Sequence, residues 1–265
     1  MIVELNGAPL SESRIQGLAL YNYGHFTTFV ADRGRVKGLD LHLDRLDRDS
    51  EAMHGTGLDR GGVRELIAGA VGRIEGRAVL RVTVFDPDLD LGRPAAVLAP
   101  QVLITARAAP SGTPGPVSLG VAEYRRDLPQ VKHTGLMRTV ALRRRAQRAG
   151  FDDVAFCDDR RRLSEGATWN LAFIDHAGTL VLPDRPCLEG VTLRLLTREA
   201  EAAGVPCLRR TVTVADARSF PAGMITNAAV GSRPMRAFDG APLDPEHPVL
   251  TALRRRYERI PGEAV

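Results

Sequence analysis

One short segment constrains the fold of this 265-residue chain more than any other feature of its sequence. Residues 109–117 read APSGTPGPV and contain three prolines and two glycines. Proline removes a backbone hydrogen-bond donor and glycine is costly to order, so neither a helix nor a central strand is expected to run through this segment. We therefore predict an N-terminal domain of residues 1–108, a linker of residues 109–117 and a C-terminal domain of residues 118–265.

Both predicted domains mix strands and helices, which indicates an α/β or α+β fold. In the N-terminal part, VELNGAPL predicts a hairpin, and a turn at Arg33-Gly34 separates two strands before a helix near residues 40–56. In the C-terminal part, helices are predicted to end at Gly150 and at Gly204, because glycine is favoured just past the last turn. Further strands are predicted at AVLRVTVF, QVLITAR, DVAFC, LAFID, LVLP, TVTV and MITNAAV.

Composition excludes several function classes. Hydrophobic residues make up 44% of the chain, enough for a proper core, and no apolar run reaches the length of a membrane span or signal sequence. The net charge of +4 comes with acidic residues interleaved throughout, which argues against nucleic-acid binding. The three cysteines have neither zinc-site nor disulfide spacing. We expect a cytoplasmic protein without a nucleic-acid or membrane partner.

Lysine is rare in this chain and therefore informative. Of 36 basic residues counted as lysine plus arginine, only Lys37 and Lys132 are lysines. Arginine keeps its proton in proteins and cannot form an imine, whereas lysine can lose its proton and react as an amine. Lys37 lies in a turn region, so Lys132 is the candidate for amine chemistry.

Three motifs in sequence order would suit pyridoxal phosphate. Lys132 precedes a helix, Glu165 follows on or beside a strand, and the segment 190–192 opens a second helix. The cofactor's aldehyde needs an amine, its pyridine nitrogen needs a carboxylate, and its phosphate suits a helix N-terminus with a threonine hydroxyl. No metal site is expected, because His25, His42 and His133 lack a second ligand at metal spacing.

At these motifs the sequence resembles the class IV aminotransferases, which are fold type IV pyridoxal-phosphate enzymes. The resemblance covers nearly the whole chain and rests on YNYGHFTT, HLDRL, VKHTG, LSEGATWNLAFI, LEGVT and TNAAVGSRPM. It implies two domains, a small N-terminal α/β domain and a larger C-terminal pseudobarrel domain that binds the cofactor. It also implies a homodimer with pyridoxal 5'-phosphate as cofactor.

The resemblance assigns a role to each matching position. Lys132 would be the Schiff-base lysine that also moves the proton at the substrate's α-carbon, and Glu165 would be the partner of the ring nitrogen. Arg45 of HLDRL would bind the phosphate. The remaining cofactor-binding positions would be Leu188 against the ring, Val191 and Thr192 at the phosphate, and Asn227 and Ala228 in TNAAVGSRPM.

Four positions depart from the family pattern. The usual Gly-Asp pair of the first motif is Asn22-Tyr23 here, and Leu193 replaces the arginine that follows Gly-Val-Thr. Ala228 replaces a threonine that often binds phosphate. The resemblance therefore supports the Schiff base at Lys132 more strongly than it supports the anchoring of the phosphate.

The resemblance leaves the reaction open between two enzymes. Arg81, Tyr21 and Phe26 match substrate-binding positions of branched-chain aminotransferases, which exchange an amino group between an amino acid and a 2-oxo acid. The pairs Lys132-His133 and Asn227-Ala228, with Thr28 as a hydroxyl near the substrate, match 4-amino-4-deoxychorismate lyase, which releases pyruvate and 4-aminobenzoate. Aminotransferase is the leading prediction, the lyase is the alternative, and a non-catalytic relative that uses the cleft for binding is the third.

Overall fold

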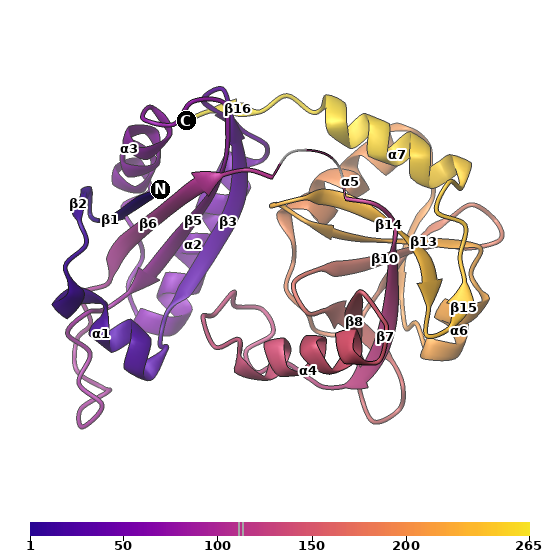
Figure 1. Cartoon of the computed structure of the whole chain (residues 1–265), viewed down its shortest axis with the longest axis horizontal. Coiled ribbons are helices and arrows are strands. Elements are labelled where there is room, and N and C mark those ends of the chain that lie inside the picture. The colour runs from indigo at the N-terminus through magenta and orange to yellow at the C-terminus, as the bar shows by residue number, and fades with distance from the viewer. Residues whose placement is uncertain (111, 113) are drawn as a thin grey trace. The chain divides into compact units, whose positions relative to one another are not determined.

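The computed structural model describes residues 1–110, 112 and 114–265 (Figure 1). The chain forms two compact units. Unit 1 comprises Met1–Ser111, Val131–Gly135 and Pro261–Val265, and unit 2 comprises Gly112–Gln130 and Leu136–Ile260. Two residues of the predicted linker, Ser111 and Thr113, lie outside the described residues. The segments Val131–Gly135 and Pro261–Val265 return to unit 1, whereas the division predicted from the sequence assigned them to the C-terminal domain.

Unit 1 is built on an antiparallel sheet. Its long central strands pair in register, with Thr28 opposite Arg81 on the neighbouring strand. Along the described residues the strand order is β16-β4-β3-β5-β6-β1-β2. The strands are β1 Ile2–Leu5, β2 Ala8–Pro9, β3 His25–Asp32, β4 Arg35–Val36, β5 Arg77–Phe85, β6 Gln101–Ala108 and β16 Glu263–Ala264.

Three helices belong to unit 1: α1 Glu12–Tyr21, α2 Leu39–His54 and α3 Arg60–Val71. Helix α2 packs against β3 and α3 against β6, and the two helices lie side by side. The helix predicted near residues 40–56 is confirmed by α2, whose Leu39, Leu43 and Leu46 are buried. The predicted hairpin is confirmed by β1 and β2, which are joined through Asn6 and Gly7, both at positive φ.

Unit 2 is built on a mixed sheet of order β12-β11-β10-β13-β14-β7-β8-β9, with β15 paired to β14. Strand β7 runs parallel to both β14 and β8, and β11 runs parallel to β12, while the other pairs are antiparallel. The strands are β7 Val117–Glu123, β8 Asp153–Cys157, β9 Leu163–Gly166, β10 Asn170–Ile174, β11 Leu180–Pro183, β12 Cys207–Arg210, β13 Ala222–Asn227, β14 Gly231–Phe238 and β15 Ala241–Pro242.

The helices of unit 2 are α4 Met137–Arg148, α5 Val191–Ala202, α6 Val214–Ser219 and α7 Pro248–Arg259. Side chains alternate along a strand, so the sheet can bury two different clusters. One cluster contains Trp169, Phe173 and Phe238, and a second joins the sheet to α5 and α7 through Leu196 and Leu250. The helices predicted before Gly150 and Gly204 are confirmed by α4 and α5.

The strand predicted at TVTV is wrong. Strand β12 ends at Arg210, and α6 begins at Val214. Thr213 caps α6 by accepting from the backbone N–H of Asp216, whose carboxylate accepts from the backbone N–H of Thr213 in return. This capping box overrides the β propensity of the threonines and valines. Among the described residues, no helix is both long and apolar enough to cross a membrane.

Candidate active site

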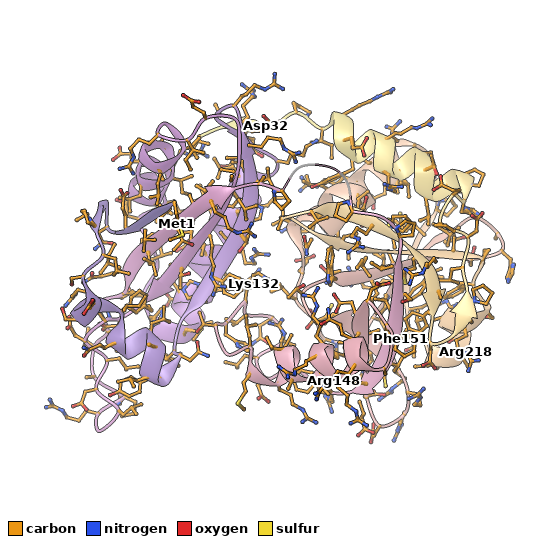
Figure 2. The ribbon with its side chains drawn as sticks, in the orientation of Figure 1. Met1, Asp32, Lys132, Arg148, Phe151 and Arg218 are labelled. Atoms are coloured by element: carbon orange, nitrogen blue, oxygen red, sulfur yellow. The ribbon has the colours of Figure 1, made fainter. Side chains whose placement is uncertain are left out.

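Lys132, which is labelled in Figure 2, belongs to the segment Val131–Gly135 of unit 1. The Lys132 carbonyl accepts from the Phe26 N–H at 2.9 Å, next to a bridge between His25 and His133. The Lys132 N–H donates to the Asp49 carboxylate at 2.9 Å, and the side chain of Asp49 is 1% exposed. Hydrogen bonds to β3 and to α2 therefore hold this lysine from two sides.

The Lys132 side chain lies in a group of predicted site residues. Its Nζ is 4.9 Å from the centroid of the Phe26 ring, and the Arg81 guanidinium carbon is 3.6 Å from the same centroid. Thr28 lies two residues beyond Phe26 on β3 and opposite Arg81, so its side chain shares their face of the sheet. Burial lowers the pKa of Arg81. The structure thus places an amine and a guanidinium beside one aromatic ring, with the Thr28 hydroxyl on the same face of the sheet.

Arg45 lies on the α2 side of the same sheet and is 6% exposed. It donates through Nη2 to the hydroxyl of Thr27, which is also 2.6 Å from Nδ1 of His42. Thr27 alternates with Phe26 and Thr28 along β3, so its side chain points to the opposite face from theirs. Burial, and secondarily the charge of Arg45, lowers the pKa of His42 well below its ordinary value. A neutral His42 thus accompanies the positive charge of Arg45.

Tyr21 is not part of this group. It ends α1, is 38% exposed, and has no hydrogen bond or ring contact among the described residues. Asn22 and Tyr23, which replace the usual Gly-Asp pair, each make a contact that supports the local structure. Asn22 adopts a left-handed conformation at φ 55°, which asparagine tolerates well, and caps α1. The Tyr23 hydroxyl donates to the carbonyl of Met53 at 2.5 Å.

Glu165 forms the centre of a second group, in unit 2. It lies on β9 and is 7% exposed. Its Oε1 accepts from Nε of Arg126 at 3.0 Å, and Oε2 faces the Leu188 N–H at 3.4 Å. Arg126 also donates through Nη2 to the Pro129 carbonyl at 2.5 Å. The side chains of Glu165 and Arg126 are each 9% exposed, so this carboxylate is paired with a cation in a nearly dry environment.

The loop that leads into α5 is anchored by Asn170. Its Nδ2 donates to the Leu188 carbonyl at 2.7 Å. A Cβ added at Gly190 would lie 2.0 Å from the Asn170 Oδ1, so only glycine fits there. Leu188 and Val191 on either side are buried at 7% and 4% exposure. The loop and the first turn of α5 are therefore held in one arrangement.

Thr192 lies in the first turn of α5 and is 1% exposed. Its hydroxyl is 3.4 Å from the hydroxyl of Tyr257 on α7, and burial raises the pKa of Tyr257. The unpaired N–H groups and positive dipole end of a helix N-terminus favour an anion. The start of α5 combines these backbone groups with a hydroxyl side chain, which suits a phosphate.

The other two departures place apolar side chains where the family resemblance implies polar ones. Leu193 is buried at 6% exposure in the cluster that joins α5 to the sheet, so it supplies packing in place of the family's arginine. Ala228 follows β13 in a turn that Asn227 closes, because the Asn227 Oδ1 accepts from the N–H groups of Ala229 and Val230 at 3.1 and 2.9 Å. The side chain of Asn227 therefore supports its own loop.

Three residues that contact these groups were not predicted from the sequence: Asp49, Arg126 and Tyr257. Their partners lie 83, 39 and 65 residues away in the chain, so no local spacing could indicate them.

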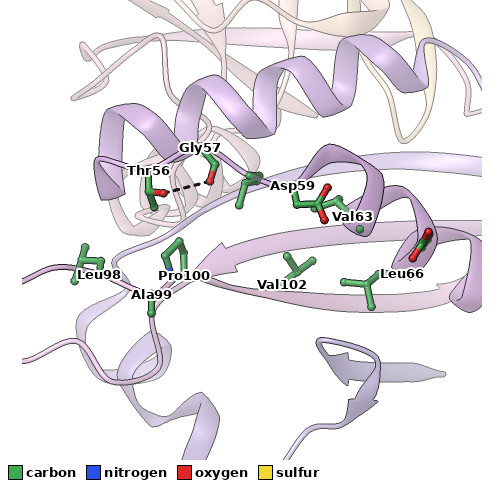
Figure 3. A pocket seen from close by; sticks show the side chains of 12 residues that line it. Thr56, Gly57, Asp59, Val63, Leu66, Leu98, Ala99, Pro100 and Val102 are labelled. Atoms are coloured by element: carbon green, nitrogen blue, oxygen red, sulfur yellow. Dashed lines mark hydrogen bonds between the residues drawn. The ribbon is translucent and has the colours of Figure 1, made fainter.

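No three His, Cys, Asp or Glu side chains of the described chain are placed to hold a metal ion. A pocket of about 650 Å³ in unit 1 is lined by Thr56, Asp59, Leu66 and Pro100 among others, and contains no predicted site residue (Figure 3).

Comparisons with known proteins agree with this architecture. The family profile for amino-transferase class IV matches residues 24–238. A branched-chain aminotransferase from Thermoproteus uzoniensis, solved with norvaline, is 20% identical, with a TM-score of 0.86 over 98% of this chain and 94% of the other. A hypothetical aminotransferase from Mycobacterium tuberculosis in its PLP-bound form is 21% identical, with a TM-score of 0.83 over 97% and 98%. No curated protein sequence matches this chain significantly.

A fold IV transaminase from Curtobacterium pusillum is 22% identical, with a TM-score of 0.81 over 96% of this chain and 92% of the other. At these identities the solved structures establish the fold, which is that of the fold type IV enzymes. The family profile covers most of the sequence. This chain belongs to the class IV aminotransferase family of pyridoxal-phosphate-dependent enzymes, as the sequence motifs predicted.

Proposed function

We propose that this enzyme moves an amino group between an amino acid and a 2-oxo acid, and that Lys132 holds the cofactor through a Schiff base. The observation that carries the proposal is the position of Lys132. Its Nζ lies beside Phe26 and shares that ring with the guanidinium of Arg81. An amine beside a partly desolvated guanidinium suits a substrate that carries both an amino group and a carboxylate.

The groups on both units have the chemistry that pyridoxal phosphate requires. Lys132 supplies the amine, and the buried carboxylate of Glu165 supplies an anion for the ring nitrogen. In unit 2, Thr192 and the N–H groups at the start of α5 suit a phosphate. In unit 1, the guanidinium of Arg45 is by itself also a candidate phosphate ligand. Leu188 would cover the ring. When bound, the cofactor supplies an aldehyde for the amino group and a pyridinium ring that accepts electron density.

The chain's own residues would then divide the work of the reaction. Arg81 would pair with the substrate carboxylate and orient the α-carbon, and Lys132 would take the proton from the α-carbon and return it at the carbon that was the cofactor's aldehyde carbon. Arg126 pairs with the Glu165 carboxylate at 3.0 Å, and a carboxylate beside the ring nitrogen would favour a proton on that nitrogen. Phe26 covers one side of the amine and excludes water.

Borohydride trapping tests the attachment directly. The protein is incubated with pyridoxal phosphate, reduced, digested and analysed by mass spectrometry. The expected result is one modified peptide that contains Lys132, with no label in Lys132→Arg. The matched control is Lys37→Arg, which removes the only other lysine and should keep the label. Label that persists in Lys132→Arg, or no label in the wild type, would disprove the assignment.

The lyase alternative has one structural observation in its favour. The hydroxyl of Thr28 shares a sheet face with Phe26 and Arg81, where it could deliver a proton to a substrate. The two reactions differ in what a donor amino acid alone does. An aminotransferase converts the bound cofactor to pyridoxamine phosphate and releases a 2-oxo acid, whereas a lyase releases pyruvate from aminodeoxychorismate and leaves the cofactor unchanged. Product analysis after a single turnover with each substrate separates them.

We also propose that the enzyme is a homodimer in the cytoplasm, as the family resemblance implies. Light scattering on the purified holoenzyme should give twice the 28.7 kDa mass of the chain. A monomer at micromolar concentration would contradict the first part of this proposal, and a fluorescent fusion found outside the cytoplasm would contradict the second.

A further inference from the structure

A small cavity in unit 2 is lined mainly by arginines. It measures about 100 Å³ and is bounded by Arg125, Arg126, Arg162 and Arg185, with Asp158, Ser164 and two prolines completing the wall. Four guanidinium groups and one carboxylate thus face one space. Because like charges gathered around one space repel each other, this lining favours an anion inside it.

The arginines are held in place from several segments of the chain. Asp158, whose side chain is 4% exposed, accepts from Nε of Arg162 at 2.8 Å and lies 3.6 Å from Nε of Arg185. Its other oxygen accepts from the backbone N–H groups of Arg160 and Arg162 at 3.0 and 2.9 Å. Burial raises the pKa of Asp158, but the hydrogen bonds from Arg160 and Arg162 and the charge of Arg162 together outweigh it and keep that pKa below its ordinary value. One carboxylate therefore orients two of the four cations.

The other two arginines extend the wall from the segment after β7. Arg126 is 9% exposed and is positioned by Glu165 and by the Pro129 carbonyl. The guanidinium of Arg125 has no hydrogen bond or ion pair with any residue in the described part of the chain. Glu165 pairs with Arg126 but does not line the cavity, so Asp158 is the carboxylate among the lining residues, against four guanidinium groups. The cavity keeps an excess of positive charge.

We propose that this cavity is a binding site for a small oxyanion of the phosphate class. The cavity has several times the space that one water molecule needs, about 10–15 Å³ in the same measure, so it can admit a tetrahedral ion of five heavy atoms. Guanidinium groups bind phosphate oxygens through paired N–H donors, and the Ser164 hydroxyl adds a further donor. The source of the ion is either free phosphate or a small phosphomonoester. The site is separate from the ligands proposed for the cofactor phosphate, and it does not rest on the proposed function.

Calorimetric titration of inorganic phosphate into the protein saturated with pyridoxal phosphate tests the site, since the cofactor then fills its own phosphate ligands. We expect one phosphate per chain at millimolar concentration or below. Arg125→Gln and Arg185→Gln should each weaken binding about tenfold, the effect typical of losing one charged hydrogen bond. The matched control is Arg148→Gln, an exposed arginine in the last turn of α4, which should bind as the wild type does.

Parallel titrations with glycerol phosphate and acetate identify the ligand class. Binding of glycerol phosphate at least as tight as that of phosphate assigns a phosphomonoester source, and weaker binding assigns free phosphate. No phosphate binding, binding unchanged in both variants, or equal binding of acetate would overturn the proposal. The titrations are repeated without cofactor. If the protein takes up no pyridoxal phosphate but still binds phosphate, and Arg125→Gln still weakens that binding, the result counts against the proposed function and not against the phosphate site.

Discussion

Arg126 and Glu165 form an ion pair at 3.0 Å in which each side chain is only 9% exposed. A carboxylate that has left water needs such a partner to remain charged. The two residues lie on separate elements of unit 2, the segment after β7 and strand β9. The pair thus sets the charge of the residue proposed to hold the cofactor's ring nitrogen.

Removing one member of this pair should be costly. Arg126→Gln leaves Glu165 buried without its cation, so we expect the free energy of unfolding to fall by about 3 kcal/mol near neutral pH. We also expect the affinity for pyridoxal phosphate to fall. Urea unfolding followed by circular dichroism measures the first effect. The double variant Arg126→Gln with Glu165→Gln should recover part of the loss, and a double variant as unstable as the sum of the single ones would contradict the pairing.

Gly190 should not tolerate even alanine. The added Cβ would meet the Asn170 Oδ1 at 2.0 Å, so the loop before α5 must move. We expect a loss of about 2 kcal/mol in the free energy of unfolding, together with weaker cofactor binding. Gly69→Ala is the matched control, because nothing lies within 4 Å of its Cβ position in α3. There the added methyl should stabilise the helix by up to about 1 kcal/mol.

Asp49 should control the local stability of the backbone at Lys132. Its carboxylate accepts from the Lys132 N–H, so Asp49→Ala is expected to speed hydrogen exchange at that amide about tenfold. Asp49→Asn retains an acceptor oxygen and should restore most of the protection. Asp47→Ala, on the same helix, breaks a bond to the Leu58 N–H and serves as the control. Equal exchange at Lys132 in all three variants would exclude this role for Asp49.

His25 should make unit 1 sensitive to acid. Burial, then the charges of His54 and Arg45, lowers the pKa of His25 from 6.5 to about 3 in the folded protein. The unfolded chain therefore takes up this proton at higher pH than the folded one does, and stability is lost as pH falls from about 6.5 toward about 3. Between about pH 7 and about pH 5 the loss from this residue should be about 2 kcal/mol.

Comparison with His25→Phe measures this contribution. Between about pH 7 and about pH 5 the wild type should lose about 2 kcal/mol more of its free energy of unfolding than His25→Phe does. A pH dependence identical in the wild type and His25→Phe would show that other groups account for the acid sensitivity.

The sequence predicted elements well where a pattern repeats over many residues. Helix α4 was recognised from its length and its terminal glycine, and β5 from its β-branched residues. Helix α1 was not, because it buries no residue and so shows no apolar periodicity. The TVTV segment was misjudged because the hydrogen bonds of a capping box outweigh β propensity.

The sequence predicted those candidate site residues whose chemical type is rare in the chain or whose position falls in a family motif. Lys132 stood out because lysine is rare in this chain, and Glu165 because a carboxylate lies in a family motif. Arg126 could not be predicted because the chain has many arginines, and what distinguishes Arg126 from the others is its ion pair with Glu165, which only the structure reveals. Tyr21 was assigned to substrate binding from its motif position, and that assignment stays a prediction: the residue ends α1 and is 38% exposed.

The segments Val131–Gly135 and Pro261–Val265, which return to unit 1, determine when that unit can finish folding during synthesis. Its sheet needs Glu263 and Ala264 to pair with β4, and its lysine segment emerges from the ribosome only after residue 135 is made. Unit 2 needs nothing beyond Ile260. Although unit 1 is translated first, it is the last of the two to be completed, and a fragment ending at residue 111 should leave its β4 edge and its β3 terminus uncovered.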